Sequence, residues 1–260
     1  MAISKFRPCI DLHGGKVKQI VGGTLSDGGD APRENYVSER SAGEFAEQFR
    51  LDNLEGGHVI KLGPGNEEAA REALGAWKGG LQIGGGIRLE NAAEWLEAGA
   101  SQVIVTSAVF DKEGKFLEDD LAALSAEVGR ERLVLDLSCK TLNDSWIVAM
   151  NRWQTLTDLT ITKESLTHLS QYCGEYLIHA ADVEGLCAGM DAPLVKFLGE
   201  WTRENDGFPI TYAGGISSMA EIDTIQEQSG GYVDYTVGSA LDLFGGNALE
   251  YTSLVKRNNL

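Results

Sequence analysis

"RPCIDLHGGK", residues 7–16, is a short apolar run that stops at a carboxylate, Asp11, and then turns through glycine. "LVLDLSCK", residues 133–140, repeats this arrangement with Asp136, which lies 125 positions after Asp11 and therefore about half the chain later. Charged residues are seldom placed at the end of a buried strand without a partner or a task. The two stretches therefore indicate a matched pair of carboxylates.

Apolar, strand-like runs recur along the whole chain, with helical patterns between them. Several are nearly continuous Val, Ile and Leu, as expected of parallel strands covered on their outer face. The eight predicted strands are residues 6–12, 58–63, 81–86, 102–107, 132–138, 175–183, 208–215 and 232–239. Eight strand–helix units predict an α/β fold, a closed (β/α)8 TIM barrel with active residues at the C-terminal strand ends. An open doubly wound sheet is the alternative, but no Gly-x-Gly-x-x-Gly follows the first strand.

The helices between these strands carry recognisable start signals. Ser41 and Glu44 form a capping-box pattern before an apolar face, and Ser218 and Glu221 form a second one. Residues 66–77 and 89–100 place Ala, Leu and Trp at helical spacing.

The two halves of the chain resemble each other. "GGI" occurs at 85–87 and again at 214–216, and Ser107 of "TSAVF" corresponds to Ser239 of "GSALDLF". These offsets of 129 and 132 positions are close to the 125 of the aspartates. A diverged half-barrel repeat is therefore predicted. We expect residues 1–260 to form a single barrel domain, with half-barrels at about 1–125 and 126–260.

The glycine turns at these repeated positions are candidate phosphate sites. Glycine lets the backbone turn sharply and approach a ligand closely, and backbone N–H groups at a helix N-terminus can hold a phosphate. A single Gly-Gly pair usually forms only a turn, but two such pairs at equivalent positions of the repeat favour two phosphate-binding sites. The first predicted site consists of Gly84, Gly85, Gly86 and Ser107, and the second of Gly214, Gly215, Gly238 and Ser239.

Asp11 and Asp136 are the candidate catalytic residues, because equivalent strand ends face each other across a barrel mouth. One carboxyl can serve as general acid and the other as general base if their surroundings separate their pKa values. Either aspartate alone would more simply cap a turn. Metal binding with His13, His58 or His179 is a rival interpretation, but no metal-ligand spacing supports it.

Two further features leave alternatives open. Lys61, inside an apolar strand, could form a Schiff base, although two aspartates favour proton transfer instead. "SWIVAMNRWQTL", residues 145–156, is long for a βα connection, and we expect a mobile loop that places Trp153 over the mouth to stack on a ring. For Trp146, a small hairpin with its own aromatic packing is an equal alternative.

Composition excludes several classes of function. The net charge of −17, without any basic cluster, argues against nucleic-acid binding. No apolar run reaches the roughly 20 residues of a membrane span, and no long apolar segment of a secretory signal follows the first basic residues, so a cytoplasmic location is expected. Cys9, Cys139, Cys173 and Cys187 include no Cys-x-x-Cys pair, which indicates reduced packing residues and no zinc site.

Taken together, "CIDLHGGKVKQIVGG", "IGGGI", "VIVTS", "VLDLS", "WIVAMNRWQTLTDL", "IHAADVEGL", "YAGGISS" and "GSALDLFGGN" resemble one family. It is the eukaryotic branch of the histidine-biosynthesis isomerases that act on phosphoribosylformimino-aminoimidazole-carboxamide ribotide. The resemblance covers the whole chain.

This resemblance implies an Amadori rearrangement of an aminoaldose to an aminoketose, with no metal and no organic cofactor, on a substrate with a phosphate at each end. The family's general base falls on Asp11, its general acid on Asp136, and its loop tryptophan on Trp153. The acidic residue at the end of strand six falls on Asp182 and is expected to bind substrate. Many bacterial relatives have threonine before that acid; here Ala181 precedes it, so we expect no catalytic help from that position.

Two alternatives remain open. The cyclase of the next step shares the half-barrel ancestry and the aspartate pair, but usually carries lysine in place of Gln19. A barrel that binds phosphorylated metabolites without catalysis is the other. The expected partner is the small bisphosphorylated ribotide, and because the duplicated barrel closes its own core, we expect a monomer.

Overall fold

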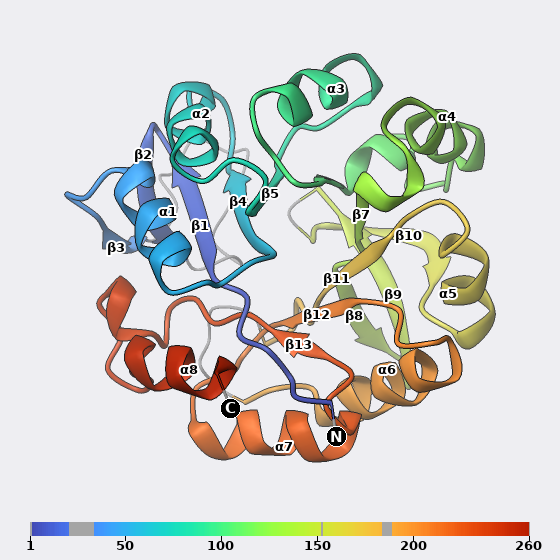
Figure 1. The fold of residues 1–260 in the computed structure, drawn as a ribbon. Coiled ribbons are helices and arrows are strands. Elements are labelled where there is room, and N and C mark those ends of the chain that lie inside the picture. The colour runs from blue at the N-terminus through green and yellow to red at the C-terminus, as the bar shows by residue number, and fades with distance from the viewer. Residues whose placement is uncertain (1, 21–33, 152, 184–188, 260) are drawn as a thin grey trace.

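Eight parallel strands form the inner wall of the structure, a computed structural model that describes residues 2–20, 34–151, 153–183 and 189–259. Figure 1 shows the strands at the centre and the helices around them in chain order. The barrel strands are β1 (Cys9–His13), β4 (Gly57–Lys61), β5 (Leu81–Gly84), β6 (Val103–Val105), β7 (Leu133–Asp136), β11 (Glu175–His179), β12 (Ile210–Ala213) and β13 (Asp234–Tyr235). One falls within or beside each predicted run, which confirms the (β/α)8 prediction.

The sheet closes between its first and last strands. Phe6, just before β1, forms a parallel bridge with Tyr235 of β13. The Arg7 N–H donates to the Tyr235 carbonyl at 2.8 Å, and the Tyr235 N–H donates to the Lys5 carbonyl at 2.9 Å. The Asn258 side chain then bonds both backbone groups of Phe6, at 2.7 and 2.9 Å. The C-terminal helix is thereby fastened to the start of the first strand.

A helix follows each barrel strand in the described part of the chain. The eight are α1 (Ala42–Leu51), α2 (Glu67–Ala76), α3 (Leu89–Glu97), α4 (Glu118–Val128), α5 (Lys163–Leu169), α6 (Ala192–Glu204), α7 (Met219–Ser229) and α8 (Tyr251–Asn258). None of these described helices has both the length and the apolar character that a membrane crossing requires.

The predicted helix starts are present, with one difference. Ser41 and Glu44 form the complete capping box at α1. At α7, the Ser218 hydroxyl accepts from the Glu221 N–H, but the Glu221 carboxylate accepts from the N–H of Ser217 instead of Ser218. In the second capping box, the bond back to the glutamate therefore comes from the residue before the N-cap and not from the N-cap residue itself.

Additional strands follow the first and fifth barrel strands. β2 (Lys16–Ile20) pairs antiparallel with β1 and with β3 (Glu34–Val37). After β7, the strands β8 (Cys139–Leu142), β9 (Ser145–Met150) and β10 (Thr155–Thr160) form a separate antiparallel sheet. The prediction of a long loop is wrong for most of residues 145–156, because these residues belong to β9 and β10 and only the turn between the two strands is irregular. The hairpin alternative is confirmed.

Strand alternation divides the interior into layers. Side chains that point outward join the main core under the helices, where Tyr176, Trp201 and Tyr212 are fully buried. Side chains that point inward at mid-barrel form a small apolar layer of Ile104, Val134 and Leu177, with Ile60 packed against it. Cys9, Cys139 and Cys173 are buried, as the packing interpretation predicts, while Cys187 lies outside the described residues.

A polar layer fills the N-terminal end of the barrel. Glu175, the first residue of β11, accepts from the Gln82 amide at 2.8 Å and from the Thr211 hydroxyl at 3.1 Å. Burial raises the pKa of Glu175 to about 7, although the charge of Arg7 and these hydrogen bonds work in the opposite direction. Near neutral pH, this carboxyl therefore carries a proton much of the time.

Replacing Glu175 by glutamine should remove part of the pH dependence of stability. The folded form binds the extra proton between the glutamate's ordinary pKa and about 7, so the free energy of unfolding falls as the pH rises through that window. In Glu175→Gln, we expect the free energy of unfolding to fall by about 1–3 kcal/mol less over this pH window. Urea unfolding at several pH values measures this difference. An unchanged slope would show that Glu175 is already ionised in mildly acidic solution.

Candidate active site

A cavity of about 610 Å³ lies at the C-terminal ends of the barrel strands. Its lining comes from both halves of the chain, and it includes both candidate catalytic aspartates. The predicted site residues that line it are Asp11, Gly85, Gly86, Ser107, Asp136, Trp153, Gly214, Gly215, Gly238 and Ser239. The half-barrel repeat therefore brings residues more than 100 positions apart into one site.

Gly84 and Asp182 are not among the described residues that line this cavity. Gly84 ends β5 and faces the barrel interior, where an added Cβ would lie 2.7 Å from Cδ1 of Ile60. The Asp182 carboxylate accepts a hydrogen bond from the Thr141 N–H at 2.7 Å. It ties β8 to the segment after β11, a structural contact that the sequence did not indicate.

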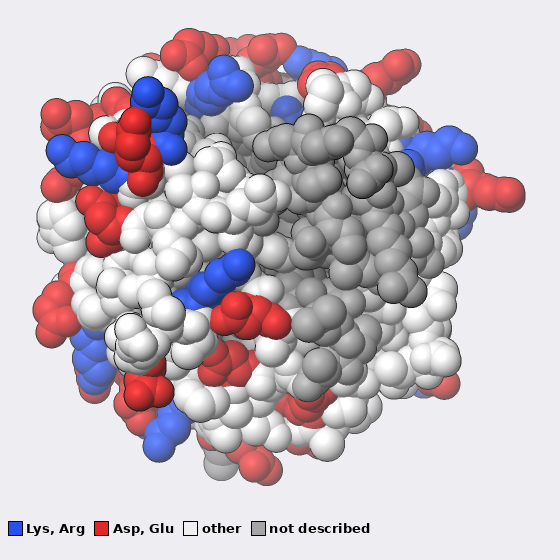
Figure 2. All heavy atoms as spheres, turned by 180° about the vertical axis from the view of Figure 1, so that it is seen from behind, with Lys and Arg blue, Asp and Glu red and all other residues white. Residues whose placement is uncertain are grey.

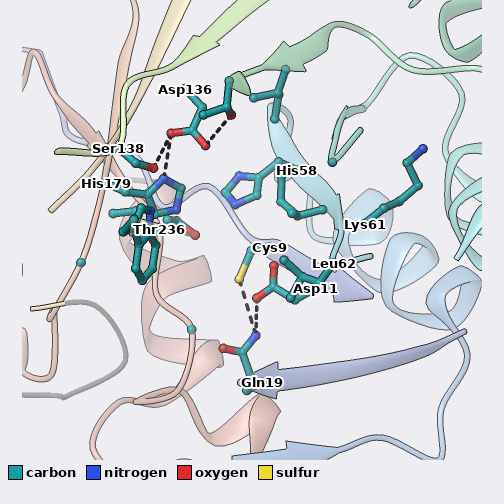
Figure 3. A pocket seen from close by; sticks show the side chains of 18 of the residues that line it. Cys9, Asp11, Gln19, His58, Lys61, Leu62, Asp136, Ser138, His179 and Thr236 are labelled. Carbon is teal, nitrogen blue, oxygen red and sulfur yellow. Dashed lines mark hydrogen bonds and ion pairs between the residues drawn. The ribbon is translucent and has the colours of Figure 1, made fainter. Parts of the chain in front are cut away.

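The Asp136 carboxylate sits among three polar side chains (Figure 3). Its Oδ1 accepts from the Ser138 hydroxyl at 2.8 Å and lies 3.3 Å from Nδ1 of His179, and its Oδ2 accepts from the Thr106 hydroxyl at 3.2 Å. Burial raises the pKa of Asp136, but the charge of His179 and these hydrogen bonds outweigh it and hold the pKa below its ordinary value. Without substrate, Asp136 is therefore ionised.

The Asp11 carboxylate has a different neighbour. Nε2 of Gln19, a residue of β2 that is only 4% exposed, donates to Oδ2 of Asp11 at 3.0 Å and lies 4.0 Å from Sγ of Cys9. An added Cβ on Gly238 would lie 2.5 Å from Oε1 of Gln19, so the absence of a side chain at that position makes room for the amide. A neutral donor thus orients the first aspartate.

His58 lies between these two clusters (Figure 3). Its side chain lines the cavity but is almost fully buried. Burial, followed by the positive charge of His179, lowers the pKa of His58 to about 3, and the opposing charge of Asp136 is too weak to restore it. The imidazole of His58 is therefore neutral throughout the physiological pH range.

The two glycine turns have matching geometry. Gly85 has φ +85°, and an added Cβ would lie 2.1 Å from the Lys61 carbonyl oxygen. Gly214, its counterpart in the repeat, has φ +127°, and its added Cβ would lie 2.9 Å from the Ala180 carbonyl oxygen. Each of these glycines directly follows the last residue of a barrel strand, β5 or β12. Only glycine fits at either turn, and both turns line the cavity, as the phosphate prediction requires.

The two tryptophans of the β8–β10 region have different roles. Trp153 lines the cavity with φ +64°, a strained conformation for a bulky residue, and its ring centroid is 6.4 Å from that of His179. Trp146 donates to Asp191 at 2.9 Å and packs on Phe197 at 5.2 Å between centroids. Trp146 is thus a packing residue, while Trp153 is held at the site.

The residues of the two rival chemistries, Lys61 and the three histidines His13, His58 and His179, also line the cavity, so their placement there decides what they can do. The Lys61 ammonium points away from the carboxylates (Figure 3) and lies 3.8 Å from the centroid of the Trp95 ring, outside the barrel wall. The direction of this side chain argues against a Schiff-base role for Lys61. Over the part of the chain that the structure describes, no group of three or more His, Cys, Asp or Glu is placed to hold a metal ion.

Polar residues that contact the two aspartates were not assigned to the site from the sequence: Gln19, Thr106, Ser138 and His179. Ala181 has no hydroxyl, as its sequence shows, but the same barrel strand places His179 beside Asp136. The sequence signal that could have identified these residues is a polar residue at every second position near the end of a strand. It is weak, because the sequence alone does not show which face of the strand points inward.

Charged side chains of both signs occur together on one face of the molecule. Figure 2 shows the side of the molecule opposite to Figure 1, with acidic and basic side chains interspersed around its edge. The net charge of −17 is thus not gathered into one acidic patch on this face.

His58 should remain neutral far below the usual pH of imidazole protonation. Its burial lowers the pKa to about 3, so we expect the ¹³C and ¹⁵N shifts of His58 in labelled protein to stay constant down to about pH 4.5. His58→Gln assigns the signal, and His168 on the surface of α5 is the internal comparison. A His58 titration near its ordinary pKa would contradict the buried, neutral state.

Comparisons with known proteins agree with this geometry. Residues 5–247 match the family described as "Histidine biosynthesis protein". The chain is 51% identical over 259 residues to a Yarrowia lipolytica protein and 50% identical over 258 residues to one from Saccharomyces cerevisiae, with 98% of each chain covered. Both are named 1-(5-phosphoribosyl)-5-((5-phosphoribosylamino)methylideneamino) imidazole-4-carboxamide isomerase. A Medicago truncatula relative of the same name, described as chloroplastic, is 45% identical over 98% of this chain and 82% of its own. The chain belongs to the histidine biosynthesis protein family.

Proposed function

We propose that this protein is the aldose–ketose isomerase of histidine biosynthesis that converts the phosphoribosylformimino-aminoimidazole-carboxamide ribotide into its phosphoribulosyl form. The observation that carries the proposal is the two-ended cavity, in which Asp11 and Asp136 lie between two matched glycine turns. Relatives at about half identity over nearly the full length bear the name of this activity.

The reaction needs one group that donates a proton and one that accepts a proton. A proton delivered to the ribose ring oxygen on the Asp136 side lets the bond between that oxygen and C1 break, while the amine nitrogen forms a C=N bond. Asp11 then takes the proton from C2, which gives an enolamine. Return of a proton to C1 and loss of the enol proton give the ketose. No bond to an external atom is made, and nothing is oxidised overall.

The surroundings of the two aspartates support this division of labour. Asp11 is oriented by a neutral amide, and its carboxylate is the candidate base. Asp136 faces the imidazole of His179 and two hydroxyls, which is a place where a proton can be stored and returned. The glycine turns hold the phosphates at the two ends of the substrate and thereby position the reacting ribose.

Two alternatives remain testable. The cyclase of the next step is disfavoured because Gln19, and not a lysine, contacts Asp11. Binding without catalysis is disfavoured because both carboxylates line the cavity.

We also propose that the protein acts as a monomer in the cytoplasm on a small bisphosphorylated ribotide, without cofactor or metal. Analytical ultracentrifugation would test the monomeric state, and a fluorescent fusion would test the cytoplasmic location.

A coupled assay tests the function directly. Purified protein is mixed with the aminoaldose ribotide, and the ketose is detected with a cyclase and ammonia, with and without a chelator. Turnover that requires this protein and persists with the chelator is expected. Consumption of preformed ketose by the protein and ammonia alone would identify a cyclase, and binding without turnover would identify a non-catalytic barrel.

Asp11→Asn and Asp136→Asn should each lower kcat strongly, because each variant removes one of the two proton transfers while it keeps the shape of the side chain. We expect a loss of about 100- to 10,000-fold in each variant, with little change in the affinity for a bisphosphate analogue measured by calorimetry. Thermal unfolding serves as the control for folding. Near-normal turnover in either variant would refute the role of that aspartate.

Trp153→Ala should weaken substrate binding, because the indole lines the cavity and its residue has a strained backbone conformation. A lost stacking contact of about 1–3 kcal/mol corresponds to a rise of about 5- to 150-fold in KM. Trp153→Phe, which keeps an aromatic face, should retain most of the affinity. Equal KM values for the alanine variant and the unmodified protein would make Trp153 a structural residue only.

A further inference from the structure

The acid step needs a proton that the described state of Asp136 does not hold. The carboxylate accepts hydrogen bonds from Ser138 and Thr106, and these bonds favour its ionised form. A general acid must instead carry a proton when the substrate arrives. A second group beside Asp136 must therefore store this proton.

We propose that His179 stores this proton, and that Asp136 and His179 act as one unit in the acid step. Nδ1 of His179 lies 3.3 Å from Oδ1 of Asp136, and both side chains are partly open to the cavity, at 18% and 16% exposure. This inference rests on the proposed isomerase function. It adds a residue from the sixth barrel strand to that reaction.

The neighbours of His179 favour a charged imidazole. The titratable groups that the described residues place toward it are Asp136 from β7 and His58 from β4, and the uncharged ring of Trp153 faces it from the turn after β9. An ionised carboxylate at this distance favours imidazolium. His58 is neutral and adds no competing charge, so it does not disfavour the protonated state of His179.

His58 itself cannot take this role. It lines the same cavity, but its pKa of about 3 leaves it without an acidic proton at neutral pH. Of the three histidines that line the cavity, His13, His58 and His179, only His179 has a carboxylate within hydrogen-bonding range in the described structure. The imidazoles of His58 and His179 are therefore not interchangeable.

The proton transfers balance. As the C1–oxygen bond of the ribose breaks, Asp136 passes a proton to the ring oxygen, and His179 replaces it from Nδ1, which leaves a neutral imidazole. Asp11 takes the C2 proton and returns it to C1. When the ketone forms, the enol proton goes back through Asp136 to His179. The unit ends as it began, without any external reactant. His179 acts through Asp136 and is thus a positioning and proton-storing residue.

The test compares two variants that each remove a contact with the same oxygen, Oδ1 of Asp136. His179→Asn removes a group that can titrate, whereas Ser138→Ala removes a hydrogen bond that cannot. The values of kcat and kcat/KM are measured for both variants and for the unmodified protein from about pH 5.5 to about pH 9.5, with the coupling enzyme in excess at every pH.

We expect the unmodified protein to lose activity on the alkaline side, as His179 loses its proton. In His179→Asn the only stored proton is that of Asp136, so the optimum should move down by about one pH unit or more, and kcat above neutrality should fall about 100-fold. KM should change little. Ser138→Ala should lower kcat without moving the alkaline limb. A uniform fall in His179→Asn with an unmoved pH profile would overturn the proposal.

A second measurement does not depend on turnover. In ¹³C,¹⁵N-histidine-labelled protein, which has four histidines, the His179 signal is assigned from its loss in His179→Asn. We expect His179 to be protonated at neutral pH and Asp136→Asn to lower its titration midpoint. A neutral His179 at pH 7 would overturn the proposal even if the isomerase assay succeeds. Absence of turnover together with a protonated His179 would instead refute the proposed function.

Discussion

Two backbone hydrogen bonds between Tyr235 and residues 5 and 7 close the sheet, and every feature of the site depends on that closure. In an open sheet, β1 would be separated from β13 and its aspartate would not face the fifth barrel strand. Closure brings the C-terminal ends of all eight strands to one mouth. Asp11 and Asp136 then line a single cavity, with one glycine turn from each half of the chain.

The half-barrel repeat provides two similar strand ends, and divergence has given them different neighbours. Gln19 from β2 places a neutral amide on Asp11, whereas Asp136 receives two hydroxyls and an imidazole. The same residue type thereby meets two electrostatic environments. In the proposed mechanism, this difference allows one carboxyl to accept a proton from carbon while the other exchanges protons with oxygen.

The sequence predicts the parts of this structure that depend on local pattern. The eight strands, the α1 capping box and the glycines at 85 and 214 all follow from periodicity or from backbone conformations that only glycine accepts. β2, β3 and β8 were not predicted, because short polar strands lack a strong apolar signal. The β9–β10 hairpin was considered only as an alternative to a loop. Gln19 and His179 were not assigned because their partners are 8 and 43 positions away and become neighbours only in the folded sheet. Asp182 was assigned to substrate binding from its motif, and that assignment stays a prediction; its bond to the Thr141 backbone is a contact that the sequence did not indicate.

The central claim is that one substrate spans both halves of the barrel with its reacting ribose between the two aspartates. The most direct test is a crystal structure of the Asp136→Asn variant with the aminoaldose ribotide bound. We expect one phosphate at Gly85, Gly86 and Ser107, the other at Gly214, Gly215 and Ser239, and C2 of the ribose within reach of Asp11. Two phosphates on the same half, or a ribose far from both aspartates, would contradict the claim.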